Sequence, residues 1–168
     1  MRETCEIDGV EVRIRPVEVT DVDRLARMAL RLSPETIYLR FFAPLPRVPR
    51  SHLERVADVD HRERDTLVAL AGDEIVAVAS YAGHAATGEA VHDAEFAVTV
   101  EDAWQHRGLG LLLARRLATV ARARGSEAFV ATILPGNRPA LGLMRKLAPD
   151  ASIRFSQGSY VARLPLAS

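Results

Sequence analysis

A short glycine-rich turn between an apolar strand and an apolar helix is the feature that most constrains the fold of this chain. The turn spans residues 105–110 and reads Gln-His-Arg-Gly-Leu-Gly; residues 94–100 before it look like a strand, and residues 111–120 after it look like a helix. The first backbone N–H groups of such a helix lack partners, and the helix dipole adds partial positive charge there. The sequence therefore predicts a binding site for a phosphate or pyrophosphate group at the start of this helix.

The turn does not match the two best-known phosphate-binding motifs. A P-loop requires a Gly-Lys-Ser/Thr triplet, which is absent from the sequence. The dinucleotide fingerprint requires a third glycine, at the position where Leu113 stands. Because short glycine motifs recur by chance, a plain strand-to-helix turn without a ligand remains the simpler alternative.

Length and composition favour one folded domain and argue against several classes of partner. The chain has 168 residues, of which 48% are hydrophobic. The 22 Lys and Arg residues balance 22 Asp and Glu residues, and aromatic residues make up only 5%. We therefore expect no nucleic-acid partner.

The sequence also gives no sign of a disulfide, a metal or a membrane. Cys5 is the only cysteine, so no intramolecular disulfide can form. No apolar run is long enough to span a bilayer and the chain start lacks a signal-peptide core, so we expect a cytoplasmic protein without membrane contact. Four histidines lack metal-ligand spacing, and we expect no metal: His52, His61, His84 and His92.

The spacing of apolar residues predicts a mixed α/β fold with a central sheet and no repeat or linker. Thr20, Ser33 (followed by Pro34) and Ser51 are expected to cap the first three helices. Gly72 and Asp73 are expected to turn a hairpin, and Gly125 to end the helix after the glycine-rich turn. The predicted order begins with a strand over residues 10–15 and three helices, over 20–32, from 33 and over 51–57. Three strands follow, over 66–71, 74–84 and 91–100, and then a helix from 109. The chain ends with a strand over 127–134, a helix over 137–147 and two strands over 151–155 and 159–164.

The turn matches the Gln/Arg-x-x-Gly-x-Gly/Ala signature of the GNAT superfamily of N-acetyltransferases, which the chain resembles over roughly residues 10–164. The resemblance implies one acetyltransferase domain over residues 1–168, with a mixed α/β fold. Its central sheet would be splayed at the acetyl-CoA site and would carry helices on both faces. The backbone of the turn would hold the pyrophosphate of acetyl-CoA through His106, Arg107, Gly108, Leu109, Gly110 and Leu111.

Residues 32–42 bring the resemblance closer to the bacterial protein-lysine acetyltransferases, in which an acyltransferase domain is joined to a regulatory domain. The regulatory domain has no counterpart here, so the resemblance gives no support for allosteric control. It implies that the acceptor is a lysine-bearing protein. A small-molecule amine acceptor and a non-catalytic acyl-CoA-binding module stay open as alternatives.

Glu95 is the candidate catalytic residue. A lysine amine has a pKa of about 10.4 and is mostly protonated at neutral pH, so acyl transfer requires a base. Strand alternation places Glu95 on one face with Asp93, Ala97 and Thr99, opposite an apolar face that would pack under the helix. In the related lysine acetyltransferases a glutamate stands at the matching position, ten residues before the motif glutamine, here Gln105. A carboxylate on an exposed strand face without catalytic function is the alternative.

The resemblance implies further cofactor contacts on this strand and on the last helix. Backbone groups of Val98, Thr99 and Val100 would pair with the pantetheine arm, and an N–H near Val98 would stabilise the oxyanion. Asn137 would cap its helix and also contact that arm. Lys146 is the cation at the position that could reach the phosphates of the cofactor.

The chain departs from the family pattern at the position of the general acid. Many members carry a tyrosine seven residues after the asparagine, where this chain has Met144. The thiolate of a thiol with a pKa of about 8.5 can leave without much help, so catalysis remains possible. The three tyrosines, Tyr38, Tyr81 and Tyr160, cannot be assigned this role from the sequence. Met144 is the best argument for a non-catalytic module, and Glu95 is the best argument against it.

Overall fold

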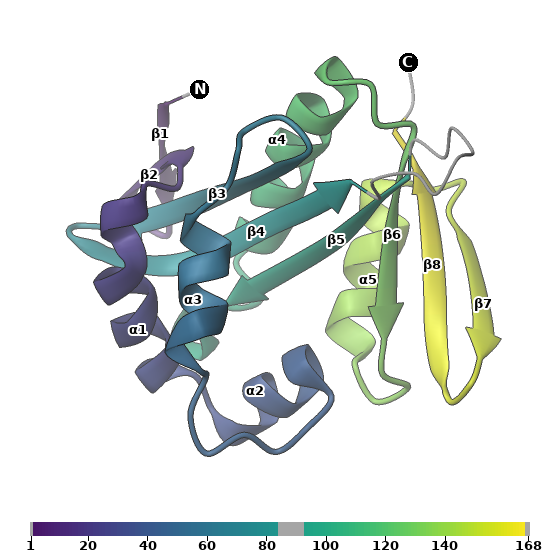
Figure 1. Cartoon of the computed structure of the whole chain (residues 1–168), viewed down its shortest axis with the longest axis horizontal. Coiled ribbons are helices and arrows are strands. Elements are labelled where there is room, and N and C mark those ends of the chain that lie inside the picture. Colours follow the sequence, from purple (N-terminus) through teal and green to yellow (C-terminus); the bar gives the residue numbers. More distant parts are fainter. Residues whose placement is uncertain (1, 84–92, 167–168) are drawn as a thin grey trace.

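The computed structural model describes residues 2–83 and 93–166 and confirms the mixed α/β fold (Figure 1). An eight-stranded sheet has the order β1-β2-β3-β4-β5-β6-β8-β7. Its strands are β1 (Glu3–Ile7), β2 (Val10–Pro16), β3 (Arg64–Ala71), β4 (Glu74–Gly83), β5 (Asp93–Val100), β6 (Ala128–Ile133), β7 (Ser152–Ser156) and β8 (Ser159–Pro165). The helices are α1 (Val22–Arg31), α2 (Pro34–Phe41), α3 (Arg50–Ala57), α4 (Leu109–Ala123) and α5 (Arg138–Leu147). His84, His92 and the residues between them, which include one end of each of the predicted strands 74–84 and 91–100, lie outside the described residues.

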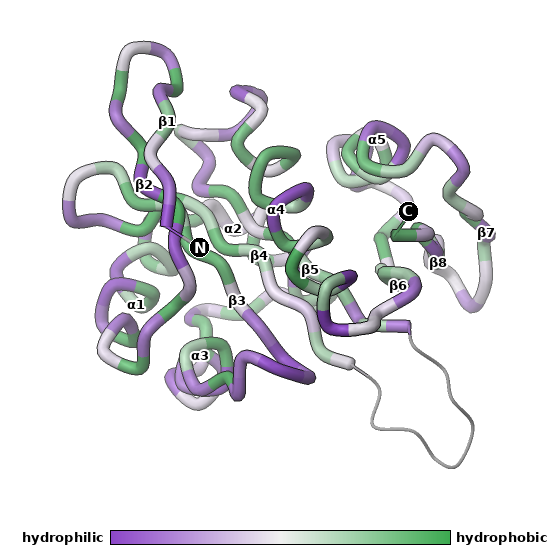
Figure 2. The backbone as a smooth tube through the Cα atoms, turned by 90° about the horizontal axis from the view of Figure 1, so that it is seen from above, coloured by the Kyte–Doolittle hydropathy of each residue, from purple (hydrophilic) through white to green (hydrophobic). Residues whose placement is uncertain are grey.

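Helices cover both faces of the sheet, as expected. Seen from above, α4 and α5 lie on one side of the sheet, and α1 and α3 lie on the other (Figure 2). The α4 side holds the larger apolar core, which includes Leu113, Leu117 and Phe129. The α1 side holds a second core around Leu25 and Val68. No helix among the described residues has the length and hydropathy needed to cross a bilayer.

One strand is present that the sequence analysis did not predict. Strand β1 pairs with β2 in an antiparallel hairpin whose turn is formed by Asp8 and Gly9, with φ values of 50° and 80°. An Asp-Gly pair is a known signal for a two-residue hairpin turn, because both central residues need positive φ. Residues 3–7 themselves alternate too weakly between apolar and polar side chains to predict a strand.

Two of the three predicted helix caps are wrong, and one is confirmed. Ser33 caps α2, since its Oγ accepts a hydrogen bond from the Thr36 N–H at 3.1 Å. A 3-10 turn (Val19–Asp21) with Glu18 at its N-cap position precedes α1, so Thr20 is not the cap. Helix α3 begins at Arg50, one residue before Ser51. Pro49, with an extended backbone (φ −60°, ψ 136°), takes the N-cap position in place of Ser51.

Asp21 links strand β2 to helix α1 from a fully buried position (0% exposed). Its carboxylate accepts hydrogen bonds from Nη1 and Nη2 of Arg15 at 2.6 and 2.9 Å, and one from the Glu18 N–H at 2.9 Å. Burial acts to raise the pKa of Asp21, but the hydrogen bonds from Arg15 and Glu18 outweigh it and hold the pKa below its usual value.

Replacing Asp21 with alanine should lower the free energy of unfolding by about 3 kcal/mol, because Arg15 loses the partner that compensates its burial. The folded pKa lies below the unfolded value of about 3.9, so this contribution is complete at neutral pH and is lost as the pH falls through the folded pKa. Urea unfolding measures the effect. Asp23→Ala, which removes an exposed carboxylate of the same helix, is the control and should cost less than about 1 kcal/mol. Equal losses in both variants would contradict the assignment.

Strands β5 and β6 separate in the middle of the sheet. They run parallel and pair over only three positions, which end with Glu95 opposite Val130. Strand β5 continues to Val100 and β6 continues to Ile133, and the two diverge over these residues (Figure 1). The sheet is therefore splayed where the sequence analysis expected it.

Candidate functional site

The splay exposes one edge of strand β5. Beyond Glu95, residues 97–100 pair with β4 on one side and, among the residues that the structure describes, have no strand partner on the side of β6. The Val100 carbonyl accepts a hydrogen bond from Gln105 Nε2 at 3.1 Å. The backbone N–H and carbonyl of Val98 face this side and are left to pair with an extended ligand in the manner of an added strand, whereas those of Thr99 face β4.

The predicted glycine-rich turn opens helix α4 beside this strand edge. His106 and Gly108 have left-handed φ values of 61° and 81°, and Gly108 is the N-cap residue of α4. No side chain of the described residues caps this helix start. A Cβ built on Gly108 would meet no atom within 4 Å. The first N–H groups of α4 thus border open space, in the arrangement that binds anions.

Gly110 holds the turn tightly against strand β5. A Cβ at this position would lie 3.2 Å from Cδ1 of Leu143 and 3.3 Å from Cγ2 of Val100. The neighbouring Leu109 is buried in the core on the α4 side. Because α4 starts in contact with the end of β5, the phosphate-binding turn and the free strand edge form one continuous site.

The side chains around the turn have partners within the protein. An Arg107 Nη1 lies 3.3 Å from an Asp8 carboxylate oxygen, and the guanidinium lies 5.4 Å from the Trp104 ring centroid. Asn137 caps α5 as predicted, since its Oδ1 accepts from the Ala140 N–H at 3.1 Å. Lys146 lies exposed in the last turn of α5.

Hydrogen bonds tie the turn to helix α2, a contact that the sequence analysis missed. Gln105 Nε2 donates to Thr36 Oγ1 at 3.2 Å as well as to the strand end. Asp102 accepts hydrogen bonds from the Ser33 N–H at 3.0 Å, the Ser33 hydroxyl at 2.6 Å and the Thr36 hydroxyl at 2.9 Å. Helix α2 is therefore fixed relative to strand β5 and the turn.

Glu95 lies where the alternation of strand β5 predicts. Its side chain is exposed, whereas the next residue, Phe96, is buried on the opposite face and stacks on Phe129 at 4.7 Å between ring centroids. Asp93 shares the face of Glu95, but both of its carboxylate oxygens lie 2.8 Å from Arg163 nitrogens. Asp93 is thus neutralised by its own partner, whereas the Glu95 side chain makes no hydrogen bond or ion pair within residues 2–83 and 93–166.

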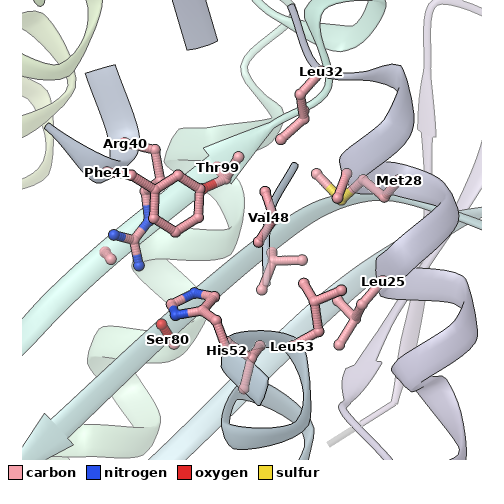
Figure 3. Close-up of a pocket in the computed structure, with 14 residues that line it drawn as sticks. Leu25, Met28, Leu32, Arg40, Phe41, Val48, His52, Leu53, Ser80 and Thr99 are labelled. Atoms are coloured by element: carbon pink, nitrogen blue, oxygen red, sulfur yellow. The ribbon is translucent and has the colours of Figure 1, made fainter. Parts of the chain in front are cut away.

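A cavity of about 60 Å³ lies on the same face of the sheet, between α1, α2, α3 and strands β4 and β5 (Figure 3). Its apolar part is lined by Leu25, Met28, Val48 and Leu53. Its polar part is lined by Arg40, His52, Ser80 and Thr99.

The imidazole ring of His52, in the polar part of the cavity, is uncharged. Its ring packs edge-on against Phe41, with 5.0 Å between ring centroids. Burial, followed by the nearby charges of Arg40 and Arg55, holds the pKa of His52 below its ordinary value, so the ring is neutral at neutral pH. The sequence analysis considered His52 only as a metal ligand, because no local pattern connects it with Arg40.

The structure places no tyrosine at the position of the family's general acid. Met144 is buried in the core (2% exposed) and has no acidic proton to give. The hydroxyl of Tyr81 donates to the Arg62 carbonyl at 3.2 Å and accepts from Arg124 at 3.3 Å, and burial raises its pKa. Tyr160 is half-buried at the start of β8. Within residues 2–83 and 93–166, no group of His, Cys, Asp or Glu is arranged to hold a metal ion.

Comparisons with known sequences identify the family of this chain and several of its relatives. The sequence profile of the Acetyltransferase (GNAT) family matches residues 33–148. Acetyltransferase PA5475 of Pseudomonas aeruginosa is 31% identical over 155 residues, which cover 86% of this chain and 81% of that protein. Acetyltransferase Pat of Mycolicibacterium smegmatis is 33% identical over 138 residues, which cover 80% of this chain but only 40% of that longer protein.

Solved structures show the same fold. The GNAT domain of S. lividans PAT superposes with a TM-score of 0.88 at 32% identity, covering 98% of this chain and 96% of that domain. The yncA protein of Salmonella typhimurium, a putative acetyltransferase solved with its cofactor acetyl-CoA, superposes with a TM-score of 0.71 at 19% identity, covering 94% of this chain and 95% of its own. At that identity the second comparison shows the fold alone.

Proposed function

This chain belongs to the acetyltransferase (GNAT) family, and we propose that it transfers the acetyl group of acetyl-CoA directly to the side-chain amine of a protein lysine. One observation carries the proposal. The splay between β5 and β6 begins at Glu95, and it lies beside the uncapped start of α4. A strand edge for the donor, an anion site for its phosphates and a base for the acceptor therefore meet in one place. A cytoplasmic location, as expected from the sequence, is part of this proposal.

In this proposal acetyl-CoA binds along the turn and the free strand edge. The backbone of residues 106–111 binds the pyrophosphate through the N–H groups at the start of α4. The backbone of Val98 and the Val100 N–H pair with the pantetheine arm, which enters the sheet as an added strand would, while the Thr99 backbone faces β4. Asn137 and Lys146 on α5 contribute to the arm and to the phosphates.

The reaction requires proton removal from the acceptor and stabilisation of the oxyanion. Glu95 removes a proton from the lysine ammonium, either directly or through a water molecule. The free amine then attacks the thioester carbonyl, and an N–H near Val98 stabilises the negative charge that develops on its oxygen. The C–S bond then breaks, and the nitrogen gives up its second proton to the leaving CoA sulfur, directly or through water. A thiol pKa of about 8.5 makes this departure feasible without an acid at Met144.

Lysine as the acceptor is supported by the similarity to Acetyltransferase Pat and to the GNAT domain of S. lividans PAT. The exposed position of Glu95 suits an acceptor that arrives on the surface of another protein. The cavity on the Glu95 face favours a second candidate, a small-molecule amine. A non-catalytic acyl-CoA-binding module is disfavoured by the carboxylate at the start of the splay.

Release of the CoA thiol from acetyl-CoA tests the proposal and separates these candidates. The purified chain is incubated with a lysine-bearing protein extract in one reaction and with a pool of small amines in another. Release with the extract alone supports lysine acetylation, and mass spectrometry then identifies the modified lysine. Release with the small amines favours the second candidate. No release in either reaction, with acetyl-CoA bound, would favour the non-catalytic module.

A further inference from the structure

Arg40, in the last turn of α2, is half-buried and lacks an oxygen partner. Within residues 2–83 and 93–166 its guanidinium makes no hydrogen bond or ion pair. Its recorded contacts are with the Phe41 ring, 5.2 Å from the guanidinium carbon to the ring centroid, and through charge with Glu95 and His52. Burial lowers the pKa of Arg40, and the charge of Glu95 opposes this effect.

Arg40 differs in this respect from the other arginines that are not fully exposed. Arg15 binds Asp21 at 2.6 Å, Arg24 lies 3.3 Å from the same carboxylate, and Arg116 binds Glu3 at 2.7 Å. A guanidinium has five N–H donors, and holding it away from water without an acceptor is costly. For the other half-buried arginines, a carboxylate partner offsets the cost of desolvation. At Arg40 the described residues provide no carboxylate at hydrogen-bond or ion-pair distance, and Glu95 acts on it only through its charge.

The position of Arg40 places this unpaired guanidinium beside the proposed catalytic centre. It lines the polar part of the cavity with His52, Ser80 and Thr99, and its side chain points toward the His52 ring (Figure 3). Thr99 shares a strand and a face with Glu95. Because Asp102 and Gln105 bind the start of α2, the helix that carries Arg40 is anchored to the same site.

The side chains of the polar part of the cavity favour a ligand with an anionic oxygen. Arg40 is a permanent cation, so a second cation is disfavoured. His52 is neutral and Ser80 carries a hydroxyl, and both can add hydrogen bonds to an oxygen ligand. A planar carboxylate fits the fork of a guanidinium best, because two parallel N–H groups bind its two oxygens.

We propose that Arg40 binds a carboxylate of the acceptor, one that lies close to the amine that is acetylated. This inference rests on the proposed function and specifies the acceptor further. The carboxylate can come from an aspartate or glutamate side chain next to the target lysine in a protein, or from the carboxyl group of a free amino acid. In both cases the amine reaches Glu95 while the carboxylate stays at Arg40.

Binding of matched ligands to the CoA-bound protein tests the proposal by calorimetry. One pair consists of lysine peptides with a flanking glutamate or glutamine, and the other of free lysine and lysine amide. The wild-type protein should bind the carboxylate member of at least one pair about tenfold more tightly. Arg40→Gln should abolish this difference while CoA affinity and melting temperature stay unchanged. Arg47→Gln, which alters an exposed arginine outside the cavity lining, should retain it.

The pair that shows the preference identifies the source of the carboxylate. Equal wild-type affinity for both members of both pairs would overturn the proposal. A preference that survives in Arg40→Gln would do the same. Acetylation of the same ligands is measured separately. A binding preference for the carboxylate ligand without acetylation supports Arg40 as the carboxylate site and contradicts the proposed acetyltransferase function. Acetylation without a binding preference overturns only the role of Arg40.

Discussion

Replacing Glu95 with glutamine should lower kcat about tenfold or more at neutral pH and leave the affinity for acetyl-CoA unchanged. Glutamine keeps the shape of the side chain but cannot accept the proton of the acceptor ammonium, and a positioned base typically contributes about 10²–10⁴ to the rate. Glu95 is exposed on the sheet face opposite α4, so the change leaves the donor contacts in place. CoA release measures kcat, and calorimetry measures the affinity for acetyl-CoA.

Asp93→Asn is the matched control for this experiment. It changes a carboxylate on the same strand and the same face, but one that is already paired with Arg163, and its kcat should stay within about twofold of wild type. The deficit of Glu95→Gln should also shrink as the pH approaches the amine pKa of about 10.4, since the acceptor then loses its proton without a base. Unchanged turnover at neutral pH, or a deficit independent of pH, would contradict the role of Glu95.

Replacing Gly108 with alanine should weaken acetyl-CoA binding about tenfold or more. A Cβ at this position enters the open space next to the first N–H groups of α4, where the pyrophosphate is proposed to bind. The substitution also strains the turn, because Gly108 has a φ of 81°, which side chains rarely adopt.

Gly125→Ala separates these two effects. Gly125 follows the other end of α4 with a φ of 93°, and a Cβ there also meets open space. Both variants should lose about 1 kcal/mol of unfolding free energy from strain, and only Gly108→Ala should lose acetyl-CoA affinity. Thermal melts measure the first effect and calorimetry measures the second. Equal acetyl-CoA affinities in the two variants would show that the turn is not the phosphate site.

Local patterns in the sequence were sufficient to predict much of the local structure around the proposed donor site. Residues that are neighbours in the chain determine three of these features: the two glycines of the turn, the helix that begins at Leu109 and the cap of α5 by Asn137. Alternation along β5 predicted that Glu95 and Phe96 lie on opposite faces. The contacts of these residues with acetyl-CoA remain predictions.

The acceptor side could not be predicted in the same way, because it is assembled from residues far apart in the chain. Asp102 binds Ser33, which lies 69 residues earlier, and the cavity joins Arg40 and His52 to two strands of the sheet. Such contacts depend on tertiary packing and leave no periodic signal. That Arg40 has no hydrogen-bond or ion-pair partner among the described residues can be established only once the positions of the neighbouring side chains are known.

Amide hydrogen exchange with and without acetyl-CoA tests the location of the donor site most directly. We predict that acetyl-CoA slows exchange at the N–H groups of residues 106–111 and at Val98 and Val100 on the free edge of β5. Amides of β1 and β2, at the far edge of the sheet, should be unaffected. Protection elsewhere, with none in these two segments, would contradict the assignment of the splay and the glycine-rich turn as the acetyl-CoA site.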